Sequence, residues 1–177
     1  CNDSDSSQPN NDADCDGVLT SDDCDDNDSS SIENSGATAD CAASSCLEIK
    51  NTVPTAADGV YFINPDAQTP YQAYCDMTTE GGGWTMVGTI YGGDANNWNT
   101  EFGYWSNSST LGSASSPYVD YKSEAWNDYP LAEAEVLYER RYDGQRKSQA
   151  VFDNECLFNK NVFSDLFATW DTSLKCG

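Results

Sequence analysis

The first 45 residues cannot build a hydrophobic core, and this limits the fold more than any other feature of the chain. Their only large aliphatic side chains are Val18, Leu19 and Ile32, whereas twelve carboxylates and no lysine or arginine fall in the same stretch. A segment with so little apolar surface and so much like charge cannot offset the conformational entropy lost on folding. Order in this part of the chain therefore needs cross-links or bound cations.

The spacing of the aspartates between residues 12 and 23 is typical of a calcium-binding loop. Carboxylates fall at loop positions 1, 3, 5 and 12, and Gly17 at position 6 permits the sharp turn. Positions 7 and 9 would add a backbone carbonyl and a hydroxyl, the latter directly or through a water. The predicted ligands are Asp12, Asp14, Asp16, Val18, Thr20 and Asp23.

A second count that begins at Asp23 predicts an adjoining loop. Asp25 and Asn27 fall at its positions 3 and 5, and Asp28 and Glu33 follow as further oxygen ligands. Oxygen-only ligands at this density favour Ca²⁺ over Mg²⁺, so we expect two calcium ions, which would neutralise about four charges. A solvated acidic linker is the alternative, but a linker does not require a glycine and a closing carboxylate at these offsets.

Composition excludes several classes of function. The 30 acidic and 8 basic residues give a net charge of −22, which disfavours binding to nucleic acids and to anionic membranes. Histidine is absent, so Ser-His and Cys-His catalysis and histidine-ligated metals are excluded. No apolar run is long enough for a transmembrane segment. Together these features favour a protein that is not an enzyme.

Eight cysteines without a C-x-x-C pair indicate disulfides formed in an oxidising compartment rather than a zinc site. We therefore expect an extracellular protein, either secreted or held at the cell surface. Cys1, ahead of a polar stretch, is compatible with a lipid anchor and equally with a disulfide. The expected organisation is a polar tether at 1–11, a calcium-binding repeat at 12–41 and a globular domain at 42–177.

The globular part has the pattern of an α+β fold with short antiparallel sheets and few helices. Turn-rich sequences separate the predicted strands, which cover residues 58–64, 71–77, 84–91, 134–142 and 148–154. The last two form a predicted hairpin, and apolar residues at three- and four-residue steps predict a helix over 158–170. We expect the N-terminal module to lack regular secondary structure.

DADCDGVLTSDDCDDND resembles the Asp- and Cys-rich calcium repeats of thrombospondin type 3 units, over residues 12–41. In such repeats cysteines link neighbouring turns. The resemblance therefore implies disulfides between Cys24 and Cys41 and between Cys1 and Cys15.

Residues 44–87 resemble the amino-terminal part of the fibrinogen-like domain, which intelectin-type lectins share. The matching motifs are Leu-Glu-Ile after Cys46, DGVY at 58–61, YCDM at 74–77 and GGGWT at 81–85. The resemblance implies a disulfide between Cys46 and Cys75, and elimination leaves Cys156 with Cys176. It continues more loosely to residue 142 and then fades, which implies a truncated domain that lacks the family's calcium and ligand pocket. No ligand-binding residue is therefore assigned.

The resemblance implies lectin-like recognition or adhesion, with glycans or an extracellular or cell-surface protein as partner. Trp98, Tyr104, Trp105 and Trp126 could stack on sugars, although packing is the commoner role of such aromatics. The alternative is a structural subunit that forms homo-oligomers or filaments in an extracellular assembly and uses the fibrinogen-like domain as a scaffold.

Overall fold

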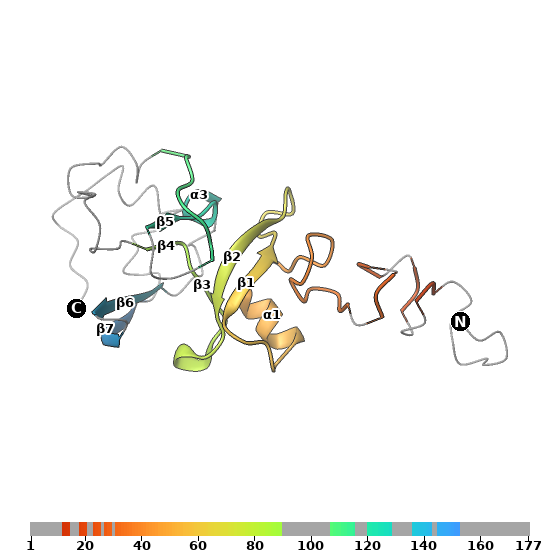
Figure 1. The fold of residues 1–177 in the computed structure, drawn as a ribbon, viewed down its shortest axis with the longest axis horizontal. Helices are drawn as coiled ribbons and strands as arrows, with labels where there is room; N and C mark the ends of the chain where they lie inside the picture. Colours follow the sequence, from red (N-terminus) through yellow and green to blue (C-terminus); the bar gives the residue numbers. More distant parts are fainter. Residues whose placement is uncertain are drawn as a thin grey trace. The chain divides into compact units, whose positions relative to one another are not determined.

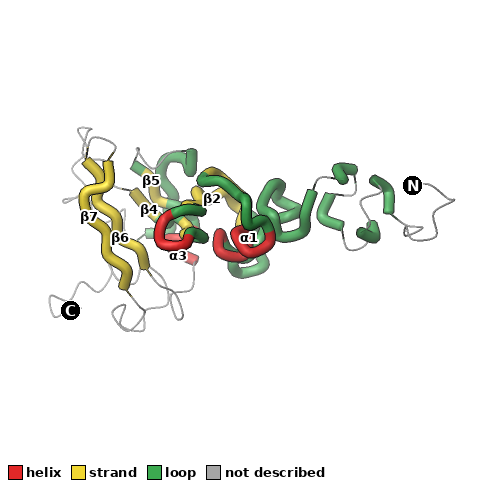
Figure 2. Tube along the Cα trace, turned by 90° about the horizontal axis from the view of Figure 1, so that it is seen from below, coloured by secondary structure: helices red, strands yellow, loops and turns green. Residues whose placement is uncertain are grey.

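The computed structural model describes residues 12–14, 18–20, 23–25, 27–29, 31–89, 107–115, 120–128, 136–142 and 145–152. The chain divides into two compact units, Cys1–Thr85 and Met86–Gly177, and each is considered by itself. The described residues that precede Cys46 form turns and bends without a helix or strand (Figures 1 and 2). In the described ranges, no helix has the length and apolar character needed to cross a bilayer.

Helix α1 (Cys46–Thr52) begins at a side-chain cap. The Ser45 hydroxyl accepts a hydrogen bond from the Glu48 backbone N–H at 3.1 Å, and the Glu48 carboxylate accepts one from the Ser44 N–H at 2.7 Å. These two bonds satisfy backbone donors that a helix start leaves without partners. Cys46 and Ile49, one turn apart, are both buried, so this face of α1 packs into the core.

Strands β1 (Gly59–Ile63), β2 (Tyr71–Asp76) and β3 (Trp84–Thr85) form an antiparallel sheet in that order. Alternate residues of β2 are buried, which is the pattern of a strand with one face on a core. Figure 1 shows α1 beside this sheet. The core that they enclose consists of Ala43, Cys46, Ile49, Ile63, Ala73, Cys75 and Met77.

The connection from β2 to β3 is a tight turn that depends on glycine. The short 3-10 helix η1 (Thr79–Gly81) is followed by Gly82, whose φ is 78°. A Cβ at Gly82 would lie 2.0 Å from the Met77 carbonyl oxygen, so no side chain fits there. Trp84 Nε1 then donates to the Thr79 carbonyl at 2.7 Å and fixes the start of β3.

In the second unit, β4 (Gly88–Thr89) pairs with β5 (Tyr121–Lys122), and α3 (Ala125–Asp128) follows. Trp126 is 6% exposed, and a Cβ at Gly88 would lie 3.3 Å from its ring, so the indole covers β4. Strands β6 (Val136–Tyr142) and β7 (Gln145–Phe152) form an antiparallel hairpin.

The strands predicted at 58–64 and 71–77 and the hairpin predicted over 134–154 are confirmed, although β7 starts earlier than expected, at Gln145. The continuous strand predicted at 84–91 is wrong. Its first residues pair with β2 and its later residues pair with β5 in another sheet. Between them, the Val87 carbonyl accepts a hydrogen bond from the Ser123 N–H at 3.0 Å. The helix predicted over 158–170 lies outside the described residues.

Candidate functional site

The structure describes nine of the ten predicted calcium ligands, and Asp16 lies outside the described residues. Asp12 is only 6% exposed, although it belongs to the most acidic part of the chain. The remaining aspartates of the first loop and the start of the second are half-buried, namely Asp14, Asp23 and Asp25. The other predicted ligands are exposed, namely Val18, Thr20, Asn27, Asp28 and Glu33.

Both predicted loops share Asp23, and the surroundings of its carboxylate bear most directly on whether a cation binds there. One of its carboxylate oxygens, Oδ1, accepts a hydrogen bond from the Asp25 N–H at 2.8 Å, and the chain then turns as the Asp28 N–H donates to the Asp25 carbonyl at 2.9 Å. The other oxygen, Oδ2, is shielded from solvent and has no hydrogen-bond partner among the described residues. A shielded carboxylate oxygen without a donor is unfavourable, and a cation would remove that penalty.

The described residues bring only part of the predicted ligand set together. Within them, no group of three or more acidic or cysteine side chains lies close enough to hold a metal ion. The oxygen-only donors and the Oδ2 atom of Asp23 fit the chemistry of calcium. The calcium loops at 12–41 and their likeness to thrombospondin type 3 repeats stay predictions.

The end of the acidic segment is tied to the sheet of the first unit. A disulfide joins Cys24 and Cys41, and the Phe62 N–H of β1 donates to the Gly36 carbonyl at 2.8 Å. A Cβ at Gly36 would lie 2.6 Å from Ile49 Cδ1, so the backbone approaches α1 closely at this point. These contacts therefore join the end of the acidic segment to the core of the first unit.

A second disulfide joins Cys46 of α1 to Cys75 of β2, and both residues are fully buried. The two pairs in the structure are those that the sequence resemblances imply. The pairs expected at the chain ends, Cys1 with Cys15 and Cys156 with Cys176, lie outside the described residues.

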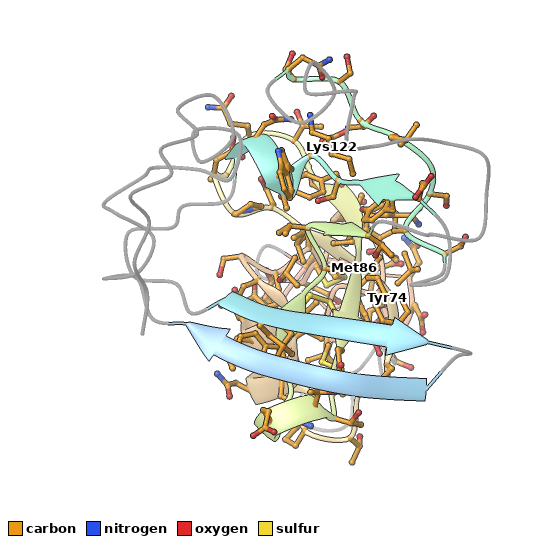
Figure 3. All side chains as sticks on the ribbon, turned by 90° about the vertical axis from the view of Figure 1, so that its left-hand side faces the viewer. Tyr74, Met86 and Lys122 are labelled. Atoms are coloured by element: carbon orange, nitrogen blue, oxygen red, sulfur yellow. A yellow bond between two sulfur atoms is a disulfide. The ribbon has the colours of Figure 1, made fainter. Side chains whose placement is uncertain are left out.

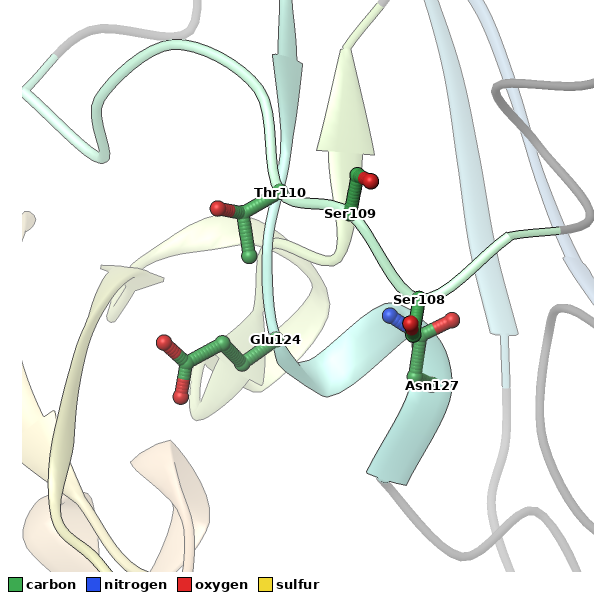
Figure 4. Close-up of a pocket in the computed structure, with 5 residues that line it drawn as sticks. All are labelled: Ser108, Ser109, Thr110, Glu124 and Asn127. Atoms are coloured by element: carbon green, nitrogen blue, oxygen red, sulfur yellow. The ribbon is translucent and has the colours of Figure 1, made fainter.

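The second unit carries an open polar depression that the sequence did not reveal. It has a volume of about 530 Å³, and the described residues that line it come from the loop before Leu111 and from the β5–α3 region (Figure 4). These residues are Ser108, Ser109, Thr110, Glu124 and Asn127. Pairing between Leu111 and Lys122 brings the two segments together. This contact joins residues far apart in the sequence, so no local motif indicates it.

Lys122 of β5 (Figure 3) is 2% exposed, and it contacts Asn107 and Leu111, which flank Ser108, Ser109 and Thr110 in the sequence. Its Nζ donates to the Asn107 carbonyl, and burial lowers the pKa of the amine. Burial also raises the pKa of Tyr121 to about 12; a hydrogen bond with Ser123 opposes this rise, and the charge of Glu124 adds to it.

The aromatic residues proposed for sugar stacking do not form a described surface. Trp126 is a core residue, which agrees with the packing role that is commoner for such aromatics and not with sugar stacking. It is buried because α3 places it over β4. Trp98, Tyr104 and Trp105 lie outside the described residues.

Comparison with known proteins finds a similarity over part of this chain. Residues 42–115 match the family model described as fibrinogen beta and gamma chains, C-terminal globular domain. Tenascin-N of Mus musculus is 46% identical over 45 residues, or 24% of this chain. The fibrinogen beta chain of Petromyzon marinus is 46% identical over 50 residues, or 24% of this chain, and that of Gallus gallus is 47% identical over 38 residues, or 21%.

The matched segments span 3%, 10% and 8% of these three relatives, in that order. The family match begins before α1, includes both buried cysteines of the Cys46–Cys75 disulfide, and contains the sheet β1–β2–β3. The family match, the relatives and the short disulfide-linked antiparallel sheet together support a fibrinogen-like domain over residues 42–115.

Proposed function

We propose that this protein is a secreted or cell-surface recognition or adhesion module of the fibrinogen-like type, that its N-terminal segment binds calcium, and that it catalyses no reaction. Two disulfides in the described residues support an oxidising, extracellular setting. The fibrinogen-like match supports a domain that recognises other molecules.

The observation that carries the calcium proposal is the shielded Oδ2 oxygen of Asp23. Its partner oxygen is already engaged by the Asp25 N–H, which leaves Oδ2 oriented without a donor in the described structure. No lysine or arginine exists in the first 45 residues to approach it. A cation from solution is therefore the natural counter-charge.

In this proposal Asp12, Asp14, Asp16 and Asp23 hold one ion, with the Val18 carbonyl and Thr20 completing its ligands. Asp23, Asp25, Asn27, Asp28 and Glu33 hold the second. When bound, calcium supplies positive charge that reduces repulsion among the carboxylates. The Cys24–Cys41 disulfide limits the separation of the second loop from the sheet and so lowers the entropy lost when its ligands are gathered.

Isothermal titration of the full chain with calcium tests this assignment. Wild type should bind calcium, and Asp23→Asn should weaken binding by at least about tenfold, because it removes a charged ligand from both loops. Asp40→Asn is the matched control, since Asp40 is exposed, acidic and outside the predicted ligand set. Equal affinity of Asp23→Asn and wild type would contradict the assignment.

The proposed recognition activity is lectin-like, and glycan binding on an array is its direct readout. The alternative of a structural subunit predicts a different result, namely ordered polymers of the purified protein without glycan binding.

A further inference from the structure

We propose that the side chains of Lys122 and Asn107 join through an amide bond, in a reaction of the chain with itself that releases ammonia. The two residues are 15 positions apart in the sequence, and their side chains meet in the second unit. The bond cross-links β5 to the loop before Leu111. This modification goes beyond the proposed recognition and calcium binding and depends on neither.

Burial of the Lys122 amine prepares it to act as a nucleophile. Lys122 is 2% exposed, although lysine is among the residues least often buried. Burial lowers the pKa of the amine and so increases the fraction of it that is neutral. A neutral amine that donates one hydrogen to the Asn107 backbone carbonyl keeps its lone pair for bond formation.

The side-chain amide of Asn107 places an electrophilic carbon beside this amine. Lys122 Nζ lies 3.4 Å from Asn107 Oδ1, which is close to the separation of groups positioned to react. The Ser109 N–H donates to the same oxygen at 2.9 Å. A donor on this oxygen stabilises the negative charge that develops there when an amine adds to the amide carbon. The turn that follows Asn107 therefore supplies a donor for the oxyanion.

The fold holds the two groups together. The backbone of Lys122 exchanges two hydrogen bonds of 3.0 Å with Leu111, which follows Asn107 in the same loop, and Lys122 Nζ holds the Asn107 backbone carbonyl. The reaction is therefore intramolecular. Well-oriented intramolecular reactions reach effective concentrations of about 10⁵–10⁸ M, and an amide without other activation needs an advantage of this kind.

The reaction needs no oxidant, reductant or cofactor. The lone pair of Lys122 Nζ attacks Asn107 Cγ, the new C–N bond forms, and the electrons of the C=O double bond move onto Oδ1. When these electrons return, the bond between Cγ and Nδ2 breaks. One proton passes from Nζ to Nδ2 through solvent water, which reaches the exposed Asn107 side chain, and Nδ2 leaves as ammonia.

Lys50 provides a comparison within the same chain. Its Nζ also donates to a backbone carbonyl, that of Met77, at 2.7 Å. Among the described residues, however, Lys50 makes no hydrogen bond to a side-chain amide. A lysine held only by a backbone carbonyl has no amide side chain to attack, so Lys50 should remain unmodified.

Mass spectrometry of the full chain in denaturant, after reduction of its disulfides, tests the bond, because a covalent link survives unfolding and a hydrogen bond does not. Wild type should weigh less than its sequence requires by the mass of one ammonia. Lys122→Met and Asn107→Ala should each have the full sequence mass, and the matched control Lys50→Met should keep the loss. Trypsin should leave wild type uncleaved after Lys122 and yield a branched peptide that contains both Lys122 and Asn107.

The result for wild type decides the matter even if a variant does not fold, since a wild-type chain with its full sequence mass would overturn the proposal. A missing ammonia that persists in Lys122→Met would also overturn it, because an asparagine that closes a ring on its own backbone loses ammonia without a lysine. A missing ammonia without the branched peptide would have the same consequence. None of these results bears on calcium binding or on recognition, so the proposed function would stand.

Discussion

Removal of the Cys46–Cys75 disulfide should destabilise the sheet of the first unit by an amount that follows from its position. The cross-linked cysteines are 29 residues apart in sequence. In the chain-entropy treatment, removing a disulfide that closes a loop of this length lowers the free energy of unfolding by about 3.6 kcal/mol at 25 °C. The double variant Cys46→Ala and Cys75→Ala leaves no free thiol, and both positions are buried in the core, so a small additional loss of packing is expected.

Hydrogen exchange of the β2 amides is the appropriate assay, because the chain has two compact units and global unfolding need not be two-state. The free energy of opening measured on β2 should fall by about 3.6 kcal/mol in the double variant. A matched double variant, Cys24→Ala with Cys41→Ala, opens a loop with a separation of 17 in the acidic segment and should affect β2 less. A decrease on β2 of less than about 1 kcal/mol would refute the reasoning.

Three further substitutions test single contacts. Gly36→Ala should destabilise the protein by about 1–3 kcal/mol in thermal unfolding, because φ is 70° and the new Cβ would lie 2.6 Å from Ile49 Cδ1; an unchanged Tm would contradict this contact. Burial by itself raises the pKa of Asp76. Hydrogen bonds from Thr79 and Thr78 outweigh burial and hold the pKa of Asp76 below 3.8. Wild type should therefore lose stability relative to Asp76→Asn as the pH falls below 3.8, and parallel acid unfolding curves would argue against it. Tyr121→Phe should remove one phenol that titrates near pH 12, and the stabilisation from neutral Tyr121 should disappear as the pH rises from 10 to 12; an unchanged phenolate titration would count against this burial.

Local sequence signals account for much of the first unit. Short segments bounded by turn-rich sequences predict β1 and β2, and the motifs around Cys46 and Cys75 imply the disulfide that joins α1 to β2. Helix α1 was not predicted, although Ser45 followed by Glu48 three residues later is a recognisable capping pattern. The helix has only seven residues, so it is too short to show a clear helical period of apolar residues.

The division between β3 and β4 could not be read from the sequence. Residues 84–91 have a continuous strand pattern, and their separation depends on which distant segment each half meets. The Val87 carbonyl is taken by the N–H and hydroxyl of Ser123, 36 residues away. Pairing over such separations is a tertiary effect that outweighs local strand propensity.

The two candidate sites also differ in how far the sequence predicts them. The calcium ligands are readable because they lie at fixed offsets within one loop, and Asp23 is notable from spacing alone. The polar depression joins residues 108–110 to residues 124–127, and this proximity depends on a buried lysine, Lys122. A lysine in a sequence ordinarily indicates an exposed position, so nothing in its identity predicts this role.

Limited proteolysis in the presence and absence of calcium tests the central claim most directly. Elastase is suitable because residues 1–45 contain no lysine or arginine for trypsin, whereas Val18 and Ala37 are exposed cleavage sites. We expect calcium, but not magnesium at the same ionic strength, to slow cleavage within residues 12–41 at least about tenfold, with fragments identified by mass spectrometry. Equal cleavage rates with calcium, with magnesium and with a chelator would contradict the claim that calcium orders this segment.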